Sequence, residues 1–166
     1  MAAVITAAMI YVNSAAAVEL VQTEGEQDGY TNDHAYNNTD PILVCGEQDF
    51  AAVMEFPLQP GTKVRSARLR LTVSEVIKPG RLVLMHLLNF NNGYAETQDF
   101  YAAAEKIGEA VVEKPGPVMF TVTGAVRKDA QGPGGFTSYR LEAKEGAQIV
   151  LPSFEGKKDT ARITIE

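Results

Sequence analysis

The segment from Phe50 to Val73 constrains the fold of this chain more than any other. Small or apolar residues recur along its second half, at Val64, Ala67, Leu69, Leu71 and Val73. Basic or hydroxyl side chains mostly lie between them, and this period of two is typical of a strand in an antiparallel sheet that is buried on one face. Pro60 and Gly61 form a turn signal before it. The sequence therefore predicts two strands joined by a Pro-Gly turn, as a β-hairpin.

Length and charge limit the class of protein. The chain has 166 residues and a formal net charge of −6. This length favours one domain that buries roughly 70% of the surface of the unfolded chain. The acidic balance argues against a nucleic-acid partner, because phosphate binding needs a clustered basic face. Arg65, Arg68 and Arg70 form the densest basic group, and we interpret them as the solvated face of a strand that blocks edge pairing.

The first sixteen residues form an apolar amino-terminal arm. No Lys or Arg precedes Lys63, so the basic start of a secretion signal is missing and we expect no cleavable signal. The apolar runs are too short and interrupted for a membrane span. An arm this apolar needs a covering surface, either its own sheet, as an extra strand, or a neighbouring subunit. Its contact residues are predicted to be Val4, Ile5, Ile10, Tyr11 and Val12.

Many short strands with little helix between them predict an all-β, two-sheet antiparallel jelly-roll sandwich over residues 17–166. The strands are expected, with one of them failing, at Val4–Val12, Ala17–Thr23, Pro41–Cys45, Phe50–Phe56, Val64–Val73, Arg81–Asn89, Glu109–Val112, Val118–Val122, Phe136–Ala143, Gln148–Pro152 and Arg162–Ile165. Arg81–Asn89 is apolar on both faces and should be covered on both sides.

Two short helices and two long loops complete the predicted architecture. Ala102–Lys106 is rich in alanine, and Thr123–Lys128 begins with a threonine that could serve as its N-cap. The longest irregular stretches are Gly25–Asp40 and Phe90–Tyr101. Long loops on a rigid sandwich are where binding residues are usually found.

The stretch VCGEQDFAAVMEFPLQPGTKVRSARLRLTV resembles the DNRLRE-type domain, a β-sandwich related to carbohydrate-binding modules. The matching positions are Val53, Phe56, Leu58, Pro60, Gly61, Val64, Ser66, Ala67, Leu69, Leu71 and Val73. Further along, Phe120–Val126 is similar to a family segment with a central threonine, and Ser153-Phe154-Glu155 is similar to the stretch before its last strand. The resemblance implies a β-sandwich that binds polysaccharide.

Aromatic residues flank both long loops. Their rings could stack on a sugar while neighbouring amides and carboxylates bond its hydroxyl groups. The alternative, which we favour for a chain without tryptophan, is that they cap the core or form a protein interface, where tyrosine is also enriched. The candidate residues for contact with a glycan or a partner are Tyr30, Tyr36, Asn91, Asn92, Tyr94, Glu96 and Tyr101.

The Gly25–Asp40 loop is also dense in side-chain oxygens. Such ligands suit calcium, with Asp28, Asp33 and Asp40 as its candidate ligands. Their spacing does not fit an EF-hand. The favoured alternative is a solvated loop in which Asn and Asp form turns. We expect no other cofactor.

Catalytic motifs are missing from the sequence, and we expect no enzyme activity. Glu96, Asp99 and Glu105 could form a carboxylate pair, but no pattern indicates that one of them is buried with a raised pKa. Cys45 follows an apolar run and is expected to be a small buried residue. His86 lies in an apolar strand and is expected to be a hydrogen-bonded core residue.

Two functions remain open. The first is a structural subunit of a larger surface assembly, such as a decoration or cement protein of a virus particle. It would dock through its arm and edge strands onto other protein subunits, including copies of itself. The second is a carbohydrate-binding module that holds a polysaccharide through its loop aromatics. Both place the protein at a virion or extracellular surface, with neither nucleic acid nor membrane as a partner.

Overall fold

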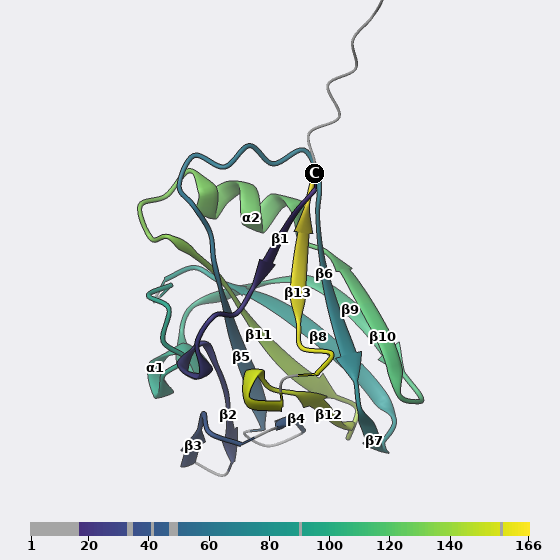
Figure 1. The fold of residues 1–166 in the computed structure, drawn as a ribbon. Coiled ribbons are helices and arrows are strands. Elements are labelled where there is room, and N and C mark those ends of the chain that lie inside the picture. The colour runs from purple at the N-terminus through teal and green to yellow at the C-terminus, as the bar shows by residue number, and fades with distance from the viewer. Residues whose placement is uncertain (1–16, 33–34, 41, 47–49, 90, 157) are drawn as a thin grey trace, which may run out of the picture.

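The computed structural model describes residues 17–32, 35–40, 42–46, 50–89, 91–156 and 158–166. Within them the chain forms an all-β sandwich with two short α-helices (Figure 1). The all-β sandwich predicted from the strand spacing is therefore confirmed. The predicted arm, including the strand Val4–Val12 and the contact residues Val4, Ile5, Ile10, Tyr11 and Val12, lies outside the described residues.

One layer of the sandwich is a six-stranded antiparallel sheet with the order β3-β2-β5-β11-β8-β9. Its strands are β2 (Asp28–Asn32), β3 (Ala35–Asn37), β5 (Ala51–Pro57), β8 (Gly80–Leu87), β9 (Ala104–Val112) and β11 (Phe136–Lys144). In Figure 1, β5, β11 and β8 cross behind the strands of the opposite layer.

The opposite layer consists of two smaller antiparallel sheets. The sandwich therefore contains three sheets, where the sequence predicts two. The first has the order β1-β13-β6-β10 and contains β1 (Val18–Val21), β6 (Ala67–Val73), β10 (Gly116–Thr121) and β13 (Arg162–Ile165). The second has the order β4-β12-β7 and contains β4 (Ile42–Cys45), β7 (Glu75–Lys78) and β12 (Gln148–Pro152). At Ser74 the chain passes from β6 into β7, and the Ser74 N–H donates to the carbonyl of Val150 at 2.9 Å.

The main hydrophobic core joins all three sheets. Its buried members include Met54, Phe56, Leu82, Leu84, Tyr139 and Leu141 from the six-stranded sheet, Leu69, Leu71, Ile163 and Ile165 from the four-stranded sheet, and Leu43, Cys45, Ile149 and Leu151 from the three-stranded sheet. Each side chain of the larger aliphatic type contributes about 1.5–3 kcal/mol when fully buried. The expectation for Cys45 is confirmed, and burial raises the pKa of its thiol to about 12.

The alternation predicted for β6 is confirmed, but the hairpin is wrong. Leu69 and Leu71 are buried, while Arg68 and Arg70 are exposed. β5 pairs with β2 and β11, whereas β6 pairs with β10 and β13, so the two strands lie in different layers. The connection around the Pro-Gly turn is too long for a tight hairpin. The turn is fixed by a contact outside β5 and β6, in which the Gly61 N–H donates to the Ala130 carbonyl at 2.7 Å.

β8 is covered on both faces, as its uninterrupted apolar sequence predicts. It pairs with β11 on one side and β9 on the other. On the face away from the main core, a second cluster contains Val53, Leu87, Ala95, Phe100 and Ala102. The connection between β8 and β9 supplies three of these residues and so covers part of the outer face of the large sheet.

One of the two predicted helices is confirmed. α2 (Thr123–Ala130) covers the end of the sandwich at the top of Figure 1. Thr123 is not its N-cap, because Val122 takes that position, and the Thr123 hydroxyl instead accepts the N–H of Ala67 at 2.9 Å. The other helix, α1, runs from Thr97 to Tyr101 and replaces the one expected at Ala102–Lys106. Its capping box, formed by Glu96 and Asp99, starts the helix earlier.

The region expected to be a loop at Gly25–Asp40 contains a short 3-10 helix, η1 (Gly25–Gln27), followed by β2 and β3. A second 3-10 helix, η2 (Phe154–Gly156), follows β12. β2 and β7 were not expected as strands because their alternation is weak, and pairing with β5 and β12 holds them in place. β9 begins at Ala104, five residues earlier than the predicted Glu109.

The other predicted strands are found in β1, β4, β5, β6, β8, β10, β11, β12 and β13, with ends that agree within three residues.

Candidate functional site

A groove lies on the outer face of the six-stranded sheet, beside the carboxyl end of β11. It has a volume of about 350 Å³, and we call it the β11 groove. α1 forms one wall, and the chain before β5 forms part of the other. The lining residues are Thr31, Gly46, Phe50, Ala51, Phe100, Tyr101, Arg140, Glu142, Ala143 and Lys144.

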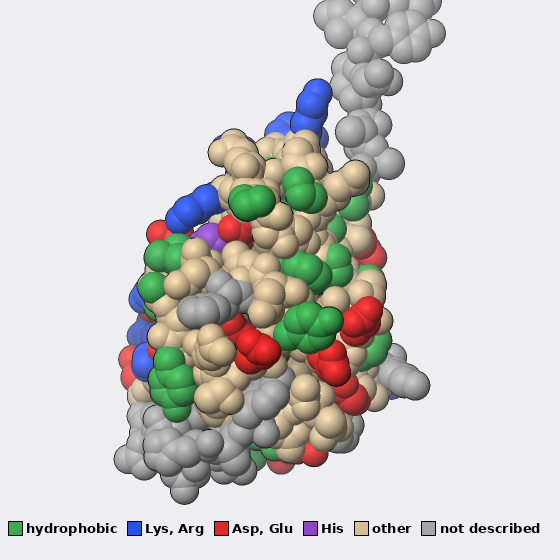
Figure 2. Space-filling model, turned by 90° about the vertical axis from the view of Figure 1, so that its left-hand side faces the viewer, with side chains coloured by type: hydrophobic (Ala, Val, Ile, Leu, Met, Phe, Trp, Pro, Cys, Tyr) green, Lys and Arg blue, Asp and Glu red, His purple; other side chains and the backbone are tan. Residues whose placement is uncertain are grey.

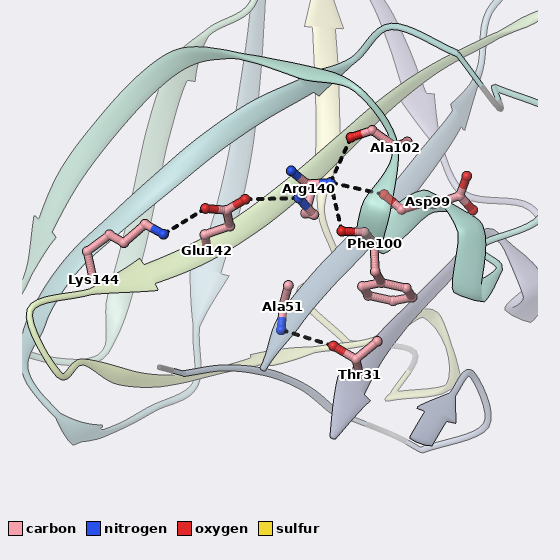
Figure 3. A network of polar contacts seen from close by, with 8 residues as sticks. All are labelled: Thr31, Ala51, Asp99, Phe100, Ala102, Arg140, Glu142 and Lys144. Atoms are coloured by element: carbon pink, nitrogen blue, oxygen red, sulfur yellow. Dashed lines mark hydrogen bonds and ion pairs between the residues drawn. The ribbon is translucent and has the colours of Figure 1, made fainter. Parts of the chain in front are cut away.

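The period of β11 places its charged residues in this groove. Tyr139, Leu141 and Ala143 point into the core, so the alternate residues Arg140, Glu142 and Lys144 lie on the outer face. The Arg140 Nε donates to Glu142 Oε1 at 2.9 Å, and the Lys144 Nζ lies 2.9 Å from Glu142 Oε2 (Figure 3). Two cations therefore share one carboxylate, and the group keeps one positive charge.

Glu142 stays ionised at neutral pH. Burial alone would raise the pKa of its carboxyl, but the bonds from Lys144 and Arg140 outweigh this effect and lower the pKa. Lys144 keeps 55% of its side chain exposed, so it can also donate to a ligand.

Arg140 also fixes the wall of the groove. Its Nη1 atom donates to the carbonyls of Asp99 at 3.2 Å, Phe100 at 2.9 Å and Ala102 at 3.1 Å (Figure 3). These carbonyls lie at the end of α1, where a helix leaves acceptors unpaired. The aromatic residues of α1 are therefore held over β11 before any ligand arrives.

Tyr101 is the most exposed aromatic residue of the groove. It is 68% exposed, whereas its neighbour Phe100 is 8% exposed and belongs to the second hydrophobic cluster. A large exposed ring next to fixed charges is what a binding surface needs.

Of the contact residues predicted from the sequence, only Tyr101 is among the described residues that line the groove. Tyr30 is buried, and its hydroxyl donates to Asp40 Oδ2 at 2.7 Å. This bond and burial raise the pKa of Tyr30 to about 12. Tyr36 belongs to β3, and its side chain lies outside the described part of the chain.

The other predicted contact residues lie in the same connection as α1 but serve different roles. Asn92 Oδ1 accepts the N–H of Tyr94 at 2.9 Å, and Tyr94 is 49% exposed. Glu96 caps α1. Asn91 lines a separate pocket near the end of α2, together with Lys128.

The sequence did not indicate Arg140, Glu142 or Lys144 as site residues. Their spacing of two within a predicted strand is the signal that could have found them, because it places all three on one face. Phe50 and Phe100 could not be found in this way, since they reach the groove through tertiary packing.

Two buried acids lie beneath the connection between β8 and β9. Glu55 has no exposed surface, and its Oε2 accepts the N–H of Gly93 at 2.5 Å. Burial raises the pKa of Glu55 to about 8. Asp99 is 1% exposed, and burial raises its pKa to about 6, so the expectation that none of the three candidate carboxylates is buried is wrong for this residue. Neither carboxyl faces the solvent, and both suit a structural role.

His86 is a buried, hydrogen-bonded histidine, as expected. Its Nε2 lies 2.9 Å from Asp129 Oδ2, and its Nδ1 lies 3.2 Å from Glu105 Oε1. Burial alone would lower the pKa of His86, but the two carboxylates outweigh it and raise the pKa. Glu105, the remaining candidate carboxylate, has its pKa lowered by the same bond.

Two of the three predicted calcium ligands bond to different groups. Asp40 bonds to Tyr30 and Asn37, whereas Asp28 accepts the N–H of Phe154 at 2.8 Å. Asp33 lies outside the described residues. Within the described ranges, there is no cluster of three or more His, Cys, Asp and Glu side chains that could hold a metal ion.

No protein-family model matches this chain, and no curated protein matches it either. The resemblance to the DNRLRE-type domain therefore rests on its motif positions. In the described part of the chain, no helix is long and apolar enough to cross a membrane.

Proposed function

We propose that this chain is a non-catalytic carbohydrate-binding module whose ligand lies in the β11 groove. The observation that carries the proposal is the exposed ring of Tyr101 beside the fixed charges of Arg140, Glu142 and Lys144. The apolar face of a sugar ring can stack on the tyrosine while its hydroxyl groups bond to Lys144 and Glu142. The motif resemblance to carbohydrate-binding β-sandwiches supports the same class of ligand.

The order of the site lowers the cost of binding. Binding loses conformational entropy for each flexible side chain that the ligand immobilises. Here the bonds of Arg140 to the end of α1, and of Glu142 to two cations, already hold most of the groove. Binding needs no covalent step, and no proton has to move.

Replacing Tyr101 with alanine tests this proposal. We expect Tyr101→Ala to weaken binding to a soluble polysaccharide by about tenfold or more, because aromatic anchors dominate such sites. Affinity electrophoresis against a panel of neutral and acidic polysaccharides measures the effect. Tyr94→Ala is the matched control, since Tyr94 is also exposed and lies in the same connection but is not among the groove residues described above. Equal losses in both variants, or no binding by the wild type, would contradict the proposal.

A second proposal is a structural subunit that docks on a larger surface assembly, such as a virus particle. Exposed aliphatic side chains on edge strands support it: Val18 and Val21 on β1, Ile42 on β4, Ile77 on β7, Val111 on β9 and Met119 on β10. Edge strands offer unpaired backbone groups to a neighbouring chain. On the face shown in Figure 2 the hydrophobic side chains stand apart from one another.

A further inference from the structure

Three segments distant in sequence meet beside β2. Gln22 follows β1, Asp28 opens β2, and Glu155 lies in η2 near the end of the chain. η1 and η2 pack against each other, as the dark purple and yellow turns of Figure 1 show. A side chain at Gly25 would collide with the Glu155 carboxylate, so the absence of a side chain at Gly25 leaves room for this carboxylate.

The oxygens of this cluster lack hydrogen-bond donors. Gln22 Oε1, Asp28 Oδ1 and Glu155 Oε2 are all buried and have no hydrogen-bond partner among the described residues. Gln22 is 5% exposed and Asp28 is 1% exposed. Buried polar atoms are nearly always paired, so three unpaired acceptors at one place need an explanation.

Rotating the Gln22 amide does not solve the problem. Its Nε2 donates to the Gln27 carbonyl at 3.0 Å, and exchanging the amide atoms would place an oxygen against that carbonyl. Gln27 is fixed in turn, because its Oε1 accepts the N–H of Thr23 at 2.7 Å. The amide oxygen of Gln22 therefore stays without a donor, and the Gln22 side chain lies close enough to the Asp28 carboxyl to lower its pKa.

The charge of the cluster is also uncompensated. No ion pair joins Asp28 or Glu155 to a basic side chain within the described ranges. Asp28 Oδ2 accepts one N–H, from Phe154 at 2.8 Å. Burial raises the pKa of Asp28 to about 7, and the nearby Glu155 carboxylate adds to this rise. A single proton shared between two of these oxygens would leave the third unpaired and one negative charge in place, whereas a divalent cation could contact all three and cancel both charges.

We propose that Gln22, Asp28 and Glu155 form a calcium-binding site that joins the first turn of the domain to its last. The donor set consists of hard oxygens from two carboxylates and one amide, which calcium prefers. Calcium also tolerates ligands from irregular turns, whereas magnesium demands a near-ideal octahedron. Glu155 is only partly buried, which gives an ion a path from solvent. The site shares Asp28 with the one expected from the sequence, but its other two ligands are different.

Calorimetric titration of the full-length chain with calcium chloride, after treatment with a chelator, tests the site. We expect one calcium ion to bind per chain and to raise the melting temperature. Asp28→Asn and Glu155→Gln keep the size of each side chain and should each weaken binding by about tenfold or more, because each removes a charged ligand. Far-UV circular dichroism checks that both variants fold.

Asp40→Asn is the matched control, because Asp40 belongs to the sequence-predicted calcium loop and not to this cluster. It should bind calcium as the wild type does. The site would be overturned if the wild type shows neither heat nor a shift in melting temperature, or if Asp28→Asn and Glu155→Gln bind calcium normally. An equal response to magnesium chloride would overturn the choice of calcium.

Discussion

Glu55 places an ionisable carboxyl at a position with no exposed surface. It lies opposite Ser138 on β11, and the N–H of Gly93 donates to it from the connection above. Burial raises the pKa of Glu55, and the charge of Asp99 adds to this rise. A carboxyl in this environment keeps its proton at neutral pH and acts as a hydrogen-bonding group that holds the connection between β8 and β9 to the sheet.

Protonation of Glu55 makes stability depend on pH. Burial raises its pKa from 4.5 to about 8, so the folded state binds this proton more tightly than the unfolded state. The stabilisation is complete below the unfolded pKa and is lost as the pH rises through the folded pKa. We expect the free energy of unfolding to fall between these two values, and Glu55→Gln to flatten that fall. Urea denaturation across this range measures both slopes.

Glu142→Gln is the control for this prediction. The pKa of Glu142 is lowered from 4.5, so above about pH 6 this residue is ionised in both states and its replacement should leave the slope there unchanged. A wild-type slope in Glu55→Gln would contradict the assignment of the titration to Glu55.

Gly108 shows how one element fits against another. β9 has an irregular register with β8 beside this glycine, where Leu84 is paired with Gly108 but Met85 is paired with Lys106. A Cβ at Gly108 would lie 2.8 Å from the ring of Phe120 on β10, so the absence of a side chain lets the two edge strands approach. The sandwich therefore closes along this side through a backbone-to-ring contact.

Gly108→Ala should lower the free energy of unfolding by about 1–3 kcal/mol, because the added methyl group overfills a closed contact. Gly124→Ala in α2 is the matched control. A Cβ there meets nothing within 4 Å, so this variant should gain up to about 1 kcal/mol from helix propensity. Chemical denaturation measures both, and a Gly108→Ala variant as stable as the wild type would show that Phe120 moves freely.

The elements that could be predicted from sequence are those whose pattern is local. β6 and β11 alternate because one face meets the core, and this alternation is visible in the residues themselves. The alanines at 102–104 favour a helix by propensity, but pairing between β9 and β8 overrides that preference. In the groove, Tyr101 could be predicted from its loop, whereas the bonds that fix the end of α1 to Arg140 join residues about 40 positions apart.

At the scale of the whole molecule, three sheets share one core, and exposed aliphatic side chains remain on the strands at their edges. β1 is one of these edges, and the amino-terminal arm precedes it. An exposed edge strand is suited to pairing with another chain. This arrangement gives the assembly proposal a definite surface.

Deleting residues 1–16 tests that surface. If the chain assembles through its arm and β1, the deletion should reduce the mass measured by multi-angle light scattering from that of an oligomer to that of a monomer, while Tyr101→Ala leaves the mass unchanged. An unchanged mass after the deletion, or a monomeric wild type, would contradict assembly through the arm.

The pairing of β1 with β13 has a mechanical consequence. Val18 lies opposite Ile165, so the first and last strands of the domain meet at the same end of one ladder. Tension applied between residues 17 and 166 would pull these strands apart from that end. The hydrogen bonds of the ladder would then break one after another instead of sharing the load. A domain loaded in this direction yields at low force. A load applied at the β11 groove would strain the same fold along a different axis.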